Sequence, residues 1–105
     1  MSDRLKMRCY YTDYVVHIIR FYLSTPETLH MEGKRKADIE NWLAAQDIFR
    51  RLSAEDRETL EKIFVFRKLQ DGIRVLAEET GADERKYITL LTKTCAAIAK
   101  RRGLV

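Results

Sequence analysis

The chain has 105 residues, of which 46% are hydrophobic and 34% are charged, and its net charge is +4 at pH 7. This length and balance are typical of one folded domain with a modest core and exclude a largely disordered chain. One proline and four glycines leave few points where helices must break. We therefore expect residues 1–105 to form a single all-α domain of about five helices.

The two cysteines, Cys9 and Cys95, are far apart in the sequence and fit no zinc-ligand spacing. We expect reduced thiols, with Cys95 in the core, as in a cytoplasmic protein. No stretch is apolar enough for a signal peptide or a membrane span. The sequence thus predicts a cytoplasmic protein that has no membrane contact and needs no cofactor or metal.

The first helix is expected to begin at Thr12 or Asp13. Its apolar positions recur at helical spacing and comprise Tyr14, Val15, Ile18, Ile19 and Tyr22. His17 falls outside this stripe and has no carboxylate or cysteine cluster near it in the sequence. We therefore expect neither a catalytic nor a ligand role for His17.

A basic run, Lys34, Arg35 and Lys36, precedes a long helix that is expected to reach Leu52. The expected buried face of this helix comprises Ile39, Trp42, Leu43, Ala45, Ile48, Phe49 and Leu52. Because Trp42 lies on this face, it is expected to anchor the core. The basic run can contact a phosphate backbone, although a solvated surface is the commoner role of such a run.

The second half of the domain, residues 53–105, is expected to contain three helices. Ser53 is a suitable N-cap for the first of them. The next is expected at residues 68–80 and the last at residues 84–102. Both halves, residues 11–52 and 53–105, are expected to share one core through Trp42, Phe49, Leu60, Phe64 and Leu76.

Residues 73–90 have the pattern of a helix-turn-helix. Gly81 follows an apolar helical face where a helix would stop, and glycine adopts the required left-handed conformation easily. Asp83 can cap the next helix, which would be free to enter a DNA major groove. An ordinary helical hairpin with a glycine C-cap fits the same pattern.

The charge distribution favours nucleic acid as the partner of the last helix. Residues 53–84 contain five basic and nine acidic side chains, whereas residues 85–105 contain six basic and no acidic ones. The expected DNA-binding residues, on the face opposite the apolar stripe, are Arg85, Lys86, Thr89, Thr92 and Lys93. Arg101 and Arg102, like the basic run at residues 34–36, are weaker candidates for DNA-backbone contacts.

The second half also contains the runs LEKIF (60–64), VLAEETG (75–81), ERKY (84–87) and AAIAKRRGL (96–104). In this order they resemble the C-terminal DNA-binding region of bacterial sigma factors and of small sigma-like regulators carried by phages and integrative mobile elements. The resemblance implies that Arg85, Lys86, Thr89 and Lys93 face double-stranded DNA, and it adds RNA polymerase as a candidate partner. Residues 10–52 match no core-promoter-binding region of a complete sigma factor, so the implied role is a small transcriptional regulator.

Two other functional classes compete with this one. An enzyme is not expected, because the sequence has no Ser/His/Asp set, no glycine-rich phosphate loop and no metal-ligand spacing. The serious alternative is an all-helical protein-interaction module of a mobile element that does not bind DNA. Oligomeric state does not follow from the sequence, and a homodimer is one expectation to be tested.

Overall fold

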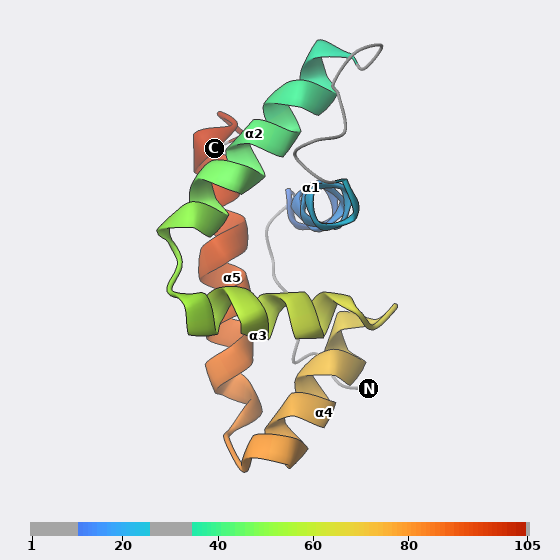
Figure 1. The fold of residues 1–105 in the computed structure, drawn as a ribbon, viewed down its shortest axis with the longest axis vertical. Helices are drawn as coiled ribbons and strands as arrows, with labels where there is room; N and C mark the ends of the chain where they lie inside the picture. The colour runs from blue at the N-terminus through green and yellow to red at the C-terminus, as the bar shows by residue number, and fades with distance from the viewer. Residues whose placement is uncertain (1–10, 26–34, 105) are drawn as a thin grey trace.

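The computed structural model describes residues 11–25 and 35–104. Within these ranges the chain forms only helices, which Figure 1 shows in chain order. They are α1 (Thr12–Ser24), α2 (Lys36–Arg51), α3 (Ala54–Phe64), α4 (Leu69–Thr80) and α5 (Glu84–Arg101). The all-α class and the five predicted helices are therefore confirmed.

Helix α5 runs along the long axis of a molecule that measures 43 × 28 × 23 Å. Its C-terminal part lies beside α1 and α2, and its N-terminal part lies beside α4 (Figure 1). Phe49, Leu60, Phe64 and Leu76 belong to one continuous buried cluster together with the apolar stripe of α5. The predicted sharing of one core by the two halves is confirmed.

Two residues of α2 differ from their predicted places. Trp42 is buried outside the continuous cluster, where its ring centroid lies 5.2 Å from that of Tyr22 and its Nε1 donates to the Thr25 carbonyl at 2.8 Å. Leu43, predicted on the buried face, is 46% exposed. The helix instead buries Ala44, next to Ala45, whose predicted burial is confirmed; their small side chains allow neighbouring helices to approach closely.

The predicted N-caps of α3 and α5 are both present. Ser53 Oγ accepts a hydrogen bond from the Asp56 amide at 3.0 Å, and Asp83 Oδ1 accepts one from the Arg85 amide at 2.8 Å. Each cap satisfies a backbone donor that the first turn of a helix leaves free. At the other end of α5, the Leu104 amide donates to the Ala99 carbonyl and Leu104 packs against the core.

Glycine is required at two places in the second half for different reasons. A Cβ on Gly72 would lie 2.7 Å from the Ile63 carbonyl oxygen, so α3 and α4 can pack this closely only without a side chain there. Gly81 has a φ of 75° and ends α4, while the space around its missing Cβ is open. The predicted left-handed turn at Gly81 is confirmed.

Replacing Gly81 with Val should therefore destabilise the protein through backbone strain alone. We expect the free energy of unfolding to fall by about 1–3 kcal/mol, because a β-branched residue fits positive φ badly. Gly81→Asn should cost much less, since asparagine tolerates this region. Urea unfolding of both variants measures the difference, and equal stabilities for Val and the parent would contradict the strained turn.

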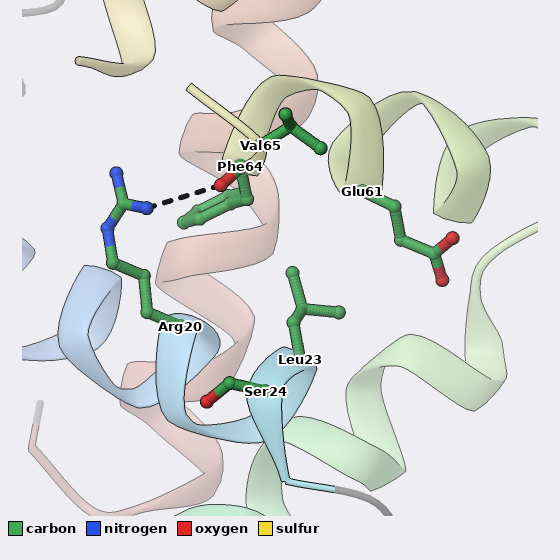
Figure 2. A pocket seen from close by; sticks show the side chains of 6 residues that line it. All are labelled: Arg20, Leu23, Ser24, Glu61, Phe64 and Val65. Atoms are coloured by element: carbon green, nitrogen blue, oxygen red, sulfur yellow. Dashed lines mark hydrogen bonds between the residues drawn. The ribbon is translucent and has the colours of Figure 1, made fainter. Parts of the chain in front are cut away.

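The first half holds the junction between α3 and α4 through Arg20, which the apolar pattern left unassigned. Its guanidinium donates to the carbonyls of Phe64 and Phe66 at 3.2 Å and of Arg67 at 2.9 Å. It also lies 5.3 Å from the centroid of the Phe64 ring. Figure 2 shows Arg20 reaching from α1 to the end of α3. A cation at a helix C-terminus satisfies carbonyls that the helix itself cannot pair.

Removal of this contact should loosen the attachment of α1 to the second half. We expect Arg20→Met to lower the free energy of unfolding by about 1.5–3 kcal/mol, the range for hydrogen bonds that involve a charged group. Lys62→Met, which breaks an exposed pair with Glu58, is the control and should cost about 0.5 kcal/mol or less. Equal losses in the two variants, measured in urea, would show that Arg20 contributes only as a surface charge.

Candidate nucleic-acid interface

Helix α5 presents one polar face to solvent and buries the other. At 100° per residue, positions 85, 86, 89, 92 and 93 fall within an arc of roughly 120°. All five predicted side chains in this arc, Arg85, Lys86, Thr89, Thr92 and Lys93, are exposed. We call these five residues the α5 face. The opposite side is buried and comprises Tyr87, Leu91, Thr94, Cys95, Ile98 and Ala99.

Hydrogen bonds of Thr80 connect the turn before α5 to the end of α4 and to the start of α5. Thr80 Oγ1 donates to the Leu76 carbonyl at 2.8 Å and lies 2.7 Å from the hydroxyl of Tyr87. The Ala82 amide donates back to Thr80 Oγ1 at 3.3 Å. The end of α4 is thus bound to the first turn of α5, and the α5 face keeps a fixed orientation relative to α4.

Arg85 is held by Asp83 at the start of the α5 face. Its Nη2 lies 3.1 Å from Asp83 Oδ2, while its side chain remains 86% exposed. The hydrogen bond from the Arg85 amide, followed by the guanidinium contact, lowers the pKa of Asp83 below its usual range. The side-chain hydrogen bond with Asp83 in turn raises the pKa of Arg85. The carboxylate therefore both caps the helix and orients the guanidinium.

Lys86 and Lys93 lie on the flank of the α5 face that is nearest to α3. Together with Thr89 they line a shallow hollow of about 180 Å³. Its other wall is the N-terminal part of α3, from which Glu55, Asp56 and Thr59 line the same space. Carboxylates and ammonium groups thus share this hollow.

The weaker DNA-backbone candidates lie elsewhere. Arg101 Nε is 3.3 Å from Asp47 Oδ2, and Arg102 Nη1 is 3.4 Å from Glu40 Oε1, so both contact acidic residues of α2. Arg101 comes sixteen positions after Arg85 in the same helix, which corresponds to a distance of about 24 Å along its axis. Only 19% of the Arg102 side chain is exposed. These two arginines attach the end of α5 to α2.

The basic run before α2 is also distant from the α5 face. Arg35 pairs with Asp38 at 3.3 Å, and Lys36 lies 4.0 Å from Glu40. Figure 1 shows the start of α2 at the opposite end of the long axis from the start of α5. Lys34 lies outside the described residues.

Sequence reasoning missed the carboxylates that accompany these cations. Residues 85–105 contain no acid, yet acidic residues from outside this segment pair with three of its six basic residues: Asp83 with Arg85, Asp47 with Arg101, and Glu40 with Arg102. Glu55 and Asp56 line the same hollow as two others, Lys86 and Lys93. Only the pairing with Asp83 had a local signal, its spacing of two residues from Arg85.

Within residues 11–25 and 35–104, no group of three or more His, Cys, Asp or Glu side chains is placed to hold a metal ion, and His17 is exposed. None of the helices described combines the length and apolarity that a membrane crossing requires. Comparison with protein-family models, with curated proteins and with solved structures finds no match to the chain.

Cys95 is the buried thiol that the sequence predicted. Burial raises its pKa to about 12, so the folded protein keeps it protonated and unreactive. Cys95 belongs to the continuous buried cluster, and desolvation in this cluster is the cause of the raised pKa.

This thiol should make stability fall at high pH. In the unfolded chain a cysteine loses its proton near pH 8.5, whereas Cys95 in the folded protein keeps it to about pH 12. Its stabilising contribution is complete below the unfolded pKa and is lost as pH rises through that window, at about 1.4 kcal/mol per pH unit. Urea unfolding of the parent and of Cys95→Ala at several pH values tests this prediction. The free energy of unfolding should decline more steeply with rising pH in the parent than in the variant, and parallel curves would contradict the prediction.

Proposed function

We propose that this protein is a small regulator of transcription that binds specific double-stranded DNA sequences through the α5 face. The observation that carries the proposal is the exposure of five polar or basic side chains on one arc of α5, directly after the left-handed turn at Gly81. A helix presented in this way fits the width of a DNA major groove. The pattern of α4, turn and α5 is then a helix-turn-helix with α5 as its reading helix.

In this complex the residues of the α5 face make different kinds of contact with DNA, according to their side-chain chemistry. Thr89 lies near the middle of the arc and can donate to or accept from a base edge. Arg85 lies toward one flank near the helix start, where base contacts of reading helices concentrate. Lys86 and Lys93 lie on the other flank, where ammonium groups can contact phosphates.

Asp83 prepares Arg85 for a base contact. Its carboxylate accepts from Nη2 of the guanidinium, while the planar group retains further N–H donors for an acceptor pair such as guanine O6 and N7. A guanidinium that is already held loses less conformational freedom when it binds. Asp83 is thus a positioning residue for Arg85.

The wider assembly follows from the same proposal. A single helix-turn-helix reads one half-site, and a two-fold dimer would read two half-sites one helical turn of DNA apart. A second copy of the chain and RNA polymerase are accordingly the partners to test once a DNA target is known. Retention of a complex on a duplex with one or two half-sites distinguishes monomer from dimer.

One observation favours the second candidate, a protein-interaction module. Val65, at the end of α3, is 81% exposed and borders two surface hollows. Figure 2 shows it beside the hollow of about 630 Å³ between α1 and α3. The other hollow, between α3 and α4, also includes Phe66, Val75 and Leu76. An exposed apolar side chain beside such hollows is typical of protein contact surfaces.

Arg85→Ala should relax sequence specificity. If Arg85 contacts a guanine, we expect a loss of about 1–3 kcal/mol of discrimination at one base pair, with little change on random DNA. The target is first selected from a randomised duplex library, and each base pair is then varied while affinity is measured by fluorescence anisotropy. Circular dichroism confirms the fold, and unchanged discrimination at every base pair would remove Arg85 from the reading set.

Lys93→Ala should act differently, since a phosphate contact carries no sequence information. We expect weaker binding to all sequences alike and a salt dependence whose slope falls by about one unit. Titrations of the selected and of a scrambled duplex at several salt concentrations measure both effects. If neither variant alters binding while the fold stays intact, α5 is not the reading helix and the protein-interaction function takes its place.

A further inference from the structure

We propose that Glu55 and Asp56 set the sequence specificity of the α5 face by repelling DNA phosphates beside Lys86 and Lys93. This inference rests on the proposed DNA-binding function and assigns a role to residues of α3. These carboxylates would weaken binding to any duplex, so that a target must supply base contacts in order to be held. Their role is selective repulsion.

The geometry supports this role. Glu55 and Asp56 occupy the first turn of α3 and line the same hollow of about 180 Å³ as Lys86 and Lys93. In the described part of the chain, no ion pair joins these two carboxylates to the two lysines. The lysines therefore remain able to contact DNA, but a phosphate that approaches them along the hollow also approaches two like charges.

The position of Glu55 and Asp56 at the start of α3 places the repulsion where a phosphate would otherwise be attracted. Without acidic residues, the N-terminus of α3 would attract phosphates, because free amides and the helix dipole favour anions there. In this protein Ser53 already satisfies the Asp56 amide, and the acidic pair occupies the first turn. The end of α3 beside the reading helix is thereby converted from an attractive site for phosphate into a repulsive one.

This repulsion should lower the affinity for random DNA sequences more than the affinity for the selected target sequence. Sequence-independent binding depends almost wholly on phosphate contacts, and the protein samples many placements on the duplex. A selected duplex also gains hydrogen bonds to base edges, in particular from Arg85, which does not line the hollow shared with α3. Removing the negative charge should hence raise affinity for random DNA more than affinity for the target.

The test compares two substitutions that change the net charge equally. Glu55→Gln removes a carboxylate from the hollow, whereas Glu61→Gln removes an exposed carboxylate from the same helix on the side that faces α1. Affinities of the full chain for a selected duplex and for a random duplex of equal length are measured by fluorescence anisotropy at several salt concentrations. Circular dichroism and urea unfolding verify that both variants keep the fold.

We expect Glu55→Gln to raise affinity for the random duplex three- to tenfold and affinity for the selected duplex less than twofold. The double variant with Asp56→Asn should enlarge this difference, and Glu61→Gln should change both affinities by less than twofold. Equal effects of Glu55→Gln and Glu61→Gln, or equal effects of Glu55→Gln on the two duplexes, would overturn this inference alone. If neither the parent nor Glu55→Gln binds any duplex, the proposed DNA-binding function fails together with it.

Discussion

Helix α5 supplies one buried stripe to both halves of the molecule, and this shared burial constrains the rest of the structure. Leu91, Cys95 and Ile98 belong to a continuous cluster with residues of α1, α2, α3 and α4. Because the apolar side of α5 is buried against the other helices, its polar side faces solvent. The exposure of the α5 face is thus a consequence of packing, and it leaves a rigid polar surface on which specific contacts can be built.

Polar contacts complement this apolar packing at the two ends of α5. Near its start, the Thr80–Tyr87 hydrogen bond and the Asp83 cap fix the turn. Near its end, Arg102 contacts Asn41, whose amide donates to the hydroxyl of Tyr14. Arg101 and Arg102 therefore stabilise the fold, because their guanidinium groups already contact carboxylate and amide groups of α2.

The local arrangement of charged side chains in the folded protein says more about its surface than the net charge does. A net charge of +4 and an acid-free C-terminal segment indicate a basic helix, yet Arg85, Arg101 and Arg102 pair with carboxylates, and Lys86 and Lys93 line a hollow together with Glu55 and Asp56. A phosphate near the α5 face would therefore experience much less positive potential than the sequence count implies. In the proposed complex with DNA, recognition would therefore depend on individual hydrogen bonds to base edges more than on long-range attraction of phosphates.

The sequence by itself determined the features that depend on neighbours along the chain. Helical periodicity predicted the five helices, Gly81 predicted the left-handed turn, and Ser53 and Asp83 predicted their caps, because each of these is a local property of the backbone. It also predicted the exposed side of α5, since one side of that helix is strongly apolar.

Only the tertiary structure decided which segments meet. Three features join residues whose approach depends on helix packing: the contact of Arg20 with the end of α3, the requirement for Gly72, and the hollow that α3 shares with Lys86 and Lys93. The exposure of Leu43 likewise follows from the rotation of α2 about its axis. Periodicity gives the apolar side of a helix only approximately, and the packing of side chains from the other helices fixes the rotation.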